Sequence, residues 1–260
     1  MTPQEANWHN LFGEYTPEGT TWHALTTVYS LELEIIRDYQ FTRKFSTNND
    51  KTIVYHQNTY YLPDGQTKEQ SWELEQQKCS QKDGVFHPEA EQMRAISFGN
   101  ETSIWVSKQF IPDHNFGAEV FFQQQDKRQS IIPVYEKGKL ARMVIIKENQ
   151  TEFPAKINAD KIKSLAADWS LKQIKMKPNL QAAVEEISHQ QINFNLDLAD
   201  NQSYFLPEKV YLNLPSIIKE STDFQMIVGQ QITPSIYKQI KTQYDSTGKL
   251  TELISEVYSA

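Results

Sequence analysis

Five residues in the first half of the chain carry polar side chains that could form a functional site: His23, Arg43, His56, Glu119 and Arg128. Glu119 lies in the apolar segment 118–122, and a carboxylate buried there needs a positively charged partner. Arg43 or Arg128 could supply that charge. Two interpretations stay open, because the same groups could form a structural ion pair across strands or could orient a bound ligand.

The sequence indicates neither a metal centre nor a known catalytic motif. His23 and His56 have no second ligand at the short spacing of a metal site, and Cys79 and His87 are too far apart for a compact zinc pattern. A Gly-x-Ser-x-Gly motif, a phosphate-binding loop and a dinucleotide-binding glycine pattern are also missing. We therefore predict no metal, no cofactor and no catalytic residue, although a barrel can assemble an active site from distant strands.

Aromatic residues in the same segments could either fill a core or form the wall of a cavity. Burial of each aromatic side chain contributes about 1.5–3 kcal/mol, so packing alone accounts for them. As candidates for the wall of a cavity, beside the five polar residues, we select Tyr29, Trp72 and Trp105.

Length, charge and cysteine content limit the class of protein. The chain has 260 residues, a net charge of −7 and one cysteine, Cys79. The negative charge argues against nucleic acid or an anionic membrane as the main partner. No segment approaches the roughly 20 apolar residues of a transmembrane helix, and the opening residues 1–5 show no secretory signal. A lone cysteine is typical of a reducing compartment, so we expect a soluble, cytoplasmic protein.

Short segments of alternating and β-branched residues predict an all-β protein. In residues 35–45, aromatic and arginine side chains alternate with polar ones at period two. Residues 53–62 end at Pro63-Asp64-Gly65, where proline fixes φ and glycine accepts positive φ. Further strands are expected at 71–74, 104–106 and 118–122. Connections of hairpin length favour an up-and-down antiparallel barrel, which removes exposed strand edges.

One phrase occurs twice, each time between two apolar segments. The first copy is Tyr135-Glu136-Lys137-Gly138-Lys139-Leu140, and the second is Tyr244-Asp245-Ser246-Thr247-Gly248-Lys249-Leu250. Each predicts a strand, a turn and a second strand, and the glycines lie 110 residues apart (248 − 138). We infer a duplicated architecture in which each copy closes one domain.

We predict three regions along the chain. Residues 1–150 form an N-terminal barrel, residues 151–169 form a linker with a short helix, and residues 170–260 form a smaller or incomplete second barrel. Helical spacing of apolar residues between Ile162 and Trp169 is the basis for the linker helix. Its apolar side could pack on a barrel or bind a partner.

Scattered motifs extend over most of the chain and give a family resemblance. The motifs are Trp22-His23-Ala24-Leu25-Thr26, Arg43, His56-Gln57-Asn58-Thr59-Tyr60, Trp72, Cys79, His87-Pro88, Trp105, Phe116-Gly117-Ala118-Glu119, Asp126-Lys127-Arg128-Gln129-Ser130, Phe205-Leu206-Pro207-Glu208-Lys209-Val210-Tyr211 and Tyr244-Asp245-Ser246-Thr247-Gly248. With these motifs the chain resembles a cyanobacterial and plant family of unknown function, whose plant members are biogenesis factors of the chloroplast ATP synthase.

The resemblance implies two tandem calycin-like (lipocalin-like) β-barrels, and calycins elsewhere bind small apolar ligands. Three hypotheses for function follow. The first is a non-enzymatic binding protein whose N-terminal barrel holds a small apolar or amphipathic molecule. The second is an assembly factor that binds an ATP synthase subunit through the outer surfaces of its barrels. The third is a lyase or isomerase that acts on a pigment-like substrate.

Overall fold

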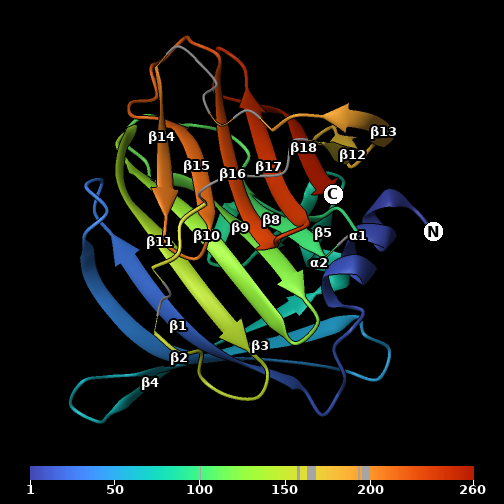
Figure 1. Cartoon of the computed structure of the whole chain (residues 1–260). Coiled ribbons are helices and arrows are strands. Elements are labelled where there is room, and N and C mark those ends of the chain that lie inside the picture. Colours follow the sequence, from blue (N-terminus) through green and yellow to red (C-terminus); the bar gives the residue numbers. More distant parts are fainter. Residues whose placement is uncertain (100, 157–158, 163–167, 193, 195–199) are drawn as a thin grey trace. The chain divides into compact units, whose positions relative to one another are not determined.

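Antiparallel strands make up most of the chain, as the computed structural model of Figure 1 shows. The described residues are 1–99, 101–156, 159–162, 168–192, 194 and 200–260. Their elements are α1 (Pro3–Phe12), β1 (Thr20–Tyr29), β2 (Ile35–Thr47), β3 (Ile53–Tyr61), β4 (Thr67–Glu75), α2 (Gln76–Cys79), β5 (Ser80–Gln81), β6 (Gly84–His87), β7 (Ala90–Ser97), β8 (Thr102–Ser107), β9 (Phe116–Gln124), β10 (Lys127–Glu136), β11 (Lys139–Asn149), β12 (Trp169–Met176), β13 (Ala182–Gln190), β14 (Asn201–Leu206), β15 (Val210–Pro215), β16 (Phe224–Thr233), β17 (Ile236–Tyr244) and β18 (Leu250–Ser259). The predicted all-β class is confirmed.

The chain forms two compact units. Unit 1 comprises Met1–Val106, Gly117–Pro133 and Arg142–Lys156, and unit 2 comprises Ser107–Phe116, Val134–Ala141 and Ile157–Ala260. Unit 2 thus takes two short segments from the first 150 residues, namely the β8–β9 connection and the tip of the β10–β11 hairpin. The predicted boundaries after residues 150 and 169 remain a proposal.

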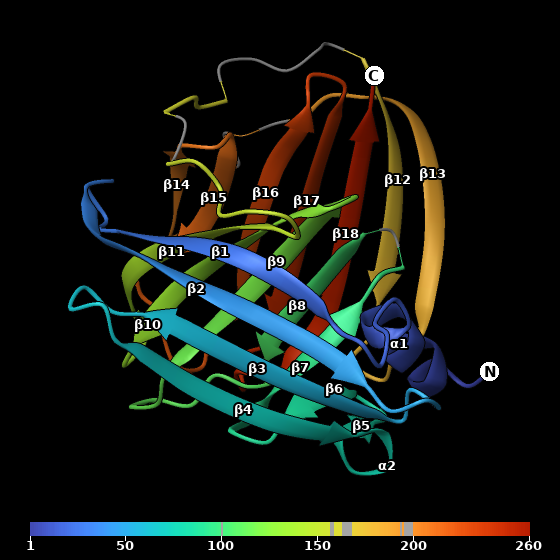
Figure 2. The same ribbon diagram turned by 90° about the horizontal axis from the view of Figure 1, so that it is seen from below.

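Eleven strands form the first sheet, in the order β4-β3-β2-β1-β11-β10-β9-β8-β7-β6-β5. Most neighbours in this order are consecutive in the chain, which is the up-and-down topology expected from the short connections. The two end strands, β4 and β5, are joined by the four residues of α2, so the sheet curves back on itself and nearly closes into a barrel (Figure 2). A nearly closed sheet leaves space for a ligand between its inner side chains.

The second sheet has seven strands, in the order β13-β12-β18-β17-β16-β15-β14. One of its core clusters contains Trp169, Leu171, Tyr211, Tyr237 and Tyr258. The side chains of a strand alternate between two faces, so Trp169 and Leu171 of β12 point to the same side.

The predicted helix over residues 159–169 is not found in the part of it that the structure describes. Residues 159–162 are irregular and Trp169 begins β12, while residues 163–167 lie outside the described residues. The apolar spacing has another explanation, since Ile162 and Trp169 are both buried in the core of unit 2.

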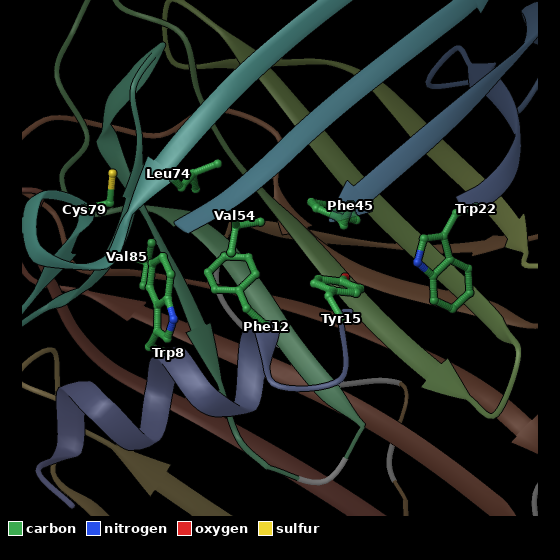
Figure 3. Close-up of a cluster of buried hydrophobic side chains, with 9 residues drawn as sticks. All are labelled: Trp8, Phe12, Tyr15, Trp22, Phe45, Val54, Leu74, Cys79 and Val85. Atoms are coloured by element: carbon green, nitrogen blue, oxygen red, sulfur yellow. The ribbon is translucent and has the colours of Figure 1, made fainter. Parts of the chain in front are cut away.

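Helix α1, which the sequence analysis did not predict, contributes to the core of unit 1. Thr2 caps it, because the Thr2 hydroxyl accepts a hydrogen bond from the Glu5 amide and the Glu5 carboxylate accepts one from the Thr2 amide. Trp8 and Phe12 then pack among side chains of the barrel, including Val54 (Figure 3). The capping pattern Thr-Pro-Gln-Glu was the available signal for this helix.

The first copy of the repeated phrase forms a fixed contact inside unit 2. The Tyr135 hydroxyl donates a hydrogen bond of 2.8 Å to the Pro215 carbonyl, and the tyrosine is fully buried. The Gly138 carbonyl accepts a hydrogen bond of 2.8 Å from the Ile218 amide. Gly138 has φ of +74°, a conformation that glycine adopts without strain.

The second copy repeats this contact with another segment of unit 2. The Tyr244 hydroxyl donates a hydrogen bond of 2.7 Å to the Ser107 carbonyl, and the Gly248 carbonyl accepts one of 2.7 Å from the Phe110 amide. The two contacted segments have the same spacing, since Pro215 lies three residues before Ile218 and Ser107 lies three residues before Phe110. The repeated phrase therefore encodes equivalent anchoring contacts, which explains why the tyrosine and the glycine occur in both copies.

Removing either tyrosine hydroxyl should destabilise the protein. In Tyr135→Phe and Tyr244→Phe a buried carbonyl loses its hydrogen-bond donor, so we expect each variant to lose about 1–2 kcal/mol of unfolding free energy. Urea denaturation measures this loss. Tyr55→Phe is the control because Tyr55 is 44% exposed. Two buried variants as stable as the control would contradict the anchoring role.

Candidate ligand-binding site

Unit 1 contains a cavity of about 880 Å³ that is lined by side chains from α1 and from strands β1–β4 and β6–β10. Its lining includes a group of aromatic rings and a group of buried charged side chains.

Six of the eight side chains selected from the sequence line this cavity: Arg43, His56, Trp72, Trp105, Glu119 and Arg128. They come from six different strands, β2, β3, β4, β8, β9 and β10. The topology of the barrel brings them together across 85 positions of sequence (128 − 43).

His23 and Tyr29 do not line the cavity. On β1 the lining residues are Thr20 and Trp22, so His23 points to the opposite face of the strand, where its ring lies 5.0 Å from the ring of Phe153. A difference of one residue along a strand is enough to exchange the two faces. Tyr29 is buried at the end of β1, beyond a register irregularity between Val28 and Tyr29.

Four residues form a buried group of charges, which we call the charge cluster: Arg43, Arg128, Glu119 and Glu148. The best-paired members are Arg128 and Glu148. Arg128 Nε and Nη2 donate hydrogen bonds of 2.6 and 3.0 Å to the two carboxylate oxygens of Glu148. Burial by itself raises the pKa of Glu148, but the charges of Arg128 and Arg43 outweigh it and hold the pKa below its usual value. Glu148 is therefore the permanent negative charge of the cluster.

Glu119 is held more weakly. Ser130 Oγ donates a hydrogen bond of 2.9 Å to Glu119 Oε1, and Arg43 Nη2 lies 3.9 Å from the same oxygen. Burial raises the pKa of Glu119, and the charge of Arg43 and the hydrogen bond from Ser130 offset only part of this effect. The two carboxyl groups of the cluster are thus shifted in opposite directions.

Two hydrogen-bond donors beside the cavity have no acceptor among the residues that the structure describes. These are Arg43 Nε and Trp22 Nε1. The side chain of Arg43 is 11% exposed and Trp22 is 1% exposed. Trp22 and Arg43 are directly paired across β1 and β2, so their side chains are neighbours on one face of the sheet. A buried donor without an acceptor costs free energy.

Trp22 also supports Arg128. The Arg128 guanidinium lies 4.6 Å from the centre of the Trp22 ring and 5.2 Å from that of Phe121. Next to them, Tyr15 stacks on Phe45 with ring centres 4.6 Å apart, and Figure 3 shows these two rings beside Trp22.

The aromatic group of the cavity lining contains two histidines between larger rings. The His56 ring lies 4.5 Å from Phe45 and 4.8 Å from Trp72, and the His87 ring lies 4.9 Å from Trp72 and 5.7 Å from Trp105. Burial lowers the pKa of His56 to about 2, and the nearby charge of Arg43 adds to this effect. Burial also lowers the pKa of His87. Both imidazoles are therefore neutral at physiological pH and act as part of an aromatic wall.

The sequence analysis missed several members of the site: Tyr15, Trp22, Phe45, His87 and Glu148. Glu148 lies near the proposed end of the first domain, but its side chain is on the same face of β11 as those of Val144 and Ile146. Its pairing with Ala24 places it on the same strand face as Trp22.

The family model for the N-terminal domain of proteins described as "Domain of unknown function (DUF3598)" matches residues 4–153. The chain therefore belongs to this family. No functionally curated protein matches its sequence. Among the described residues, none of the helices has the length and apolar character needed to cross a membrane.

A solved structure supports the fold. A DUF3598 protein of unknown function from Nostoc punctiforme is 13% identical, with a TM-score of 0.74 and coverage of 97% of this chain and 98% of that chain. Kievitone hydratase from Nectria haematococca (7% identity, 94% and 89% coverage) and a putative AttH from Nitrosomonas europaea (7% identity, 99% and 96% coverage) have TM-scores of 0.23 and 0.25. Scores this low carry no argument about fold or function.

The pKa of His56 predicts a loss of stability in mild acid. An unfolded histidine titrates near 6.5 while native His56 titrates near 2, so the unfolded chain binds one more proton below about pH 6.5. The contribution of neutral His56 to the free energy of unfolding is fully present above that pH, and it falls by up to about 1.4 kcal/mol per pH unit below it. His56→Phe keeps an aromatic ring but cannot bind this proton. Its unfolding should therefore take up about one proton fewer, which makes the slope of unfolding free energy against pH smaller.

Urea denaturation between pH 5 and 7.5 measures the slope, and His114→Phe is the control because His114 is exposed. The same slope in His56→Phe and in the unmodified protein would show that His56 is not held in its neutral form.

Proposed function

We propose that unit 1 is a binding module, without need of catalysis, that holds a small apolar or amphipathic molecule inside its barrel. The observation that carries this proposal is the open volume of about 880 Å³ behind aromatic walls. Sites for small molecules in proteins have volumes of about 300–1,000 Å³ and combine apolar walls with a few placed polar groups. The volume lies in this range, and the lining combines aromatic rings with polar and charged side chains.

Two further observations support the proposal. A barrel that served only as a scaffold would gain stability by filling its interior, since protein cores are densely packed. This barrel instead keeps a cavity that Trp22 and Arg43 line, and Trp22 Nε1 and Arg43 Nε have no acceptor among the described residues. Cys79 is buried and burial raises the pKa of its thiol, so the proposal includes an unreactive thiol. The proposal also includes a cytoplasmic location, which rests on the lone cysteine of the sequence.

Filling the cavity tests this function. Ser103 lines the cavity, so the phenyl ring of Ser103→Phe would occupy space needed by a ligand. We expect the fluorescent apolar probe N-phenyl-naphthylamine to bind the unmodified protein at one site and Ser103→Phe about tenfold or more weakly.

The matched control is Ser71→Phe, because Ser71 lies on the exposed outer face of β4. It should bind the probe as the unmodified protein does. Equal binding by both variants would place the probe outside the barrel, and no binding by the unmodified protein would contradict the proposed function.

A second candidate is the assembly factor that binds an ATP synthase subunit, favoured by the edge strand β13. This strand lies at the end of the second sheet, and Val184 and Ile187 are 58% and 37% exposed on it. An exposed edge strand can pair with a strand of another protein.

Co-purification with ATP synthase subunits from the source cells tests this second candidate. The double substitution Val184→Lys with Ile187→Lys should abolish the association, because lysines on an edge strand oppose pairing. The control carries Ile35→Lys and Ile36→Lys, since these residues are also exposed, at 59% and 57%. The second candidate would be wrong if the β13 variant kept its partner.

A further inference from the structure

The two unpaired donors of the cavity define the kind of atom that a ligand must present. Arg43 Nε and Trp22 Nε1 come from paired positions on neighbouring strands, and neither has an acceptor within the described residues. Arg43 also lines the cavity, and a guanidinium has N–H donors and no acceptor, so the matching ligand atom is an acceptor. An oxygen-bearing head group provides such an acceptor.

Arg43 differs from the other arginine of the charge cluster. Arg128 makes two hydrogen bonds to Glu148 at 2.6 and 3.0 Å. Arg43 Nη1 lies 3.5 Å from Glu148 Oε1 and its Nη2 lies 3.9 Å from Glu119 Oε1, both longer than ordinary N–H···O hydrogen bonds. Arg43 is therefore the cation whose capacity for hydrogen bonding is least used.

The charges of the cluster limit the charge of the ligand. Arg43 and Arg128 contribute two positive charges, and the well-paired Glu148 compensates one of them. Glu119 is the remaining partner: its burial favours the neutral form, and Arg43 opposes this only in part across 3.9 Å. When Glu119 carries a proton, one positive charge is left for a ligand. A single negative charge is the match, and a doubly charged group such as a phosphate monoester would be in excess.

The rest of the cavity determines the body of the ligand. Beyond the charge cluster, Phe45, Trp72, Trp105 and the neutral rings of His56 and His87 supply surfaces with aromatic character. An apolar chain or ring system gains from burial against such walls.

We propose that the ligand is a monocarboxylic acid with an apolar body, whose carboxylate binds the guanidinium of Arg43. This inference rests on the binding function proposed above and adds the chemical class of the ligand. Hydrogen bonds from a charged donor to a carboxylate are short and strong, and they are strongest where water is excluded.

Isothermal titration calorimetry with decanoic acid and decanol at neutral pH tests the inference. The two probes share an apolar chain and differ in the head group. We expect the unmodified protein to bind the acid about tenfold or more tightly than the alcohol. In Arg43→Met this preference should disappear. The control Lys44→Met removes an exposed positive charge from the next position of β2 and should keep the preference.

Each outcome has one meaning. A tenfold preference for the acid in the unmodified protein, which requires no variant to fold, supports the carboxylate. Equal binding of acid and alcohol would overturn the head-group inference and leave the binding function intact. Failure of both probes to bind would overturn the inference together with the binding function. Retention of the preference by a folded Arg43→Met would overturn the assignment to Arg43.

Discussion

The pairing of buried charges inside the barrel is the constraint on which the rest of unit 1 depends. Arg43, Arg128, Glu119 and Glu148 come from four strands, β2, β10, β9 and β11, and each is largely removed from water. Breaking a buried ion pair leaves an uncompensated charge and is strongly destabilising. These four residues therefore fix the register of the strands that carry them, and through the register they decide which side chains face the cavity.

The same cluster is built asymmetrically, and this asymmetry links structure to function. Arg128 and Glu148 satisfy each other, with Trp22 and Phe121 packed against the guanidinium. Arg43 receives only longer contacts. A cluster that served stability alone would gain from pairing all of its donors. Arg43 lines the cavity together with aromatic rings, which is the arrangement that an amphipathic ligand requires.

Much of the fold could be predicted from the sequence, because alternating strands and turn residues are local signals. The all-β class follows from such signals, the family from the scattered motifs, and the selection of Arg43 and Trp105 for the cavity from their place in predicted strands. Sites that depend on register were harder: His23 and Trp22 are adjacent, and only the pairing of β1 with β2 shows which one faces inward. Glu148 was placed at the end of the first domain and was not selected for the site. The spacing of Ile162 and Trp169 suggested a helix, whereas both side chains are buried in the core of unit 2.

Native mass spectrometry of the protein isolated from its own cells is the most direct test of a ligand-holding barrel. If the barrel of unit 1 holds a ligand, we expect a discrete, non-covalent added mass of a few hundred daltons on the unmodified protein, in keeping with the size of the cavity. The same measurement on Ser103→Phe should show the bare chain. A bare chain in both proteins, or an added protein subunit without a small molecule, would contradict the account and direct attention to the outer surface.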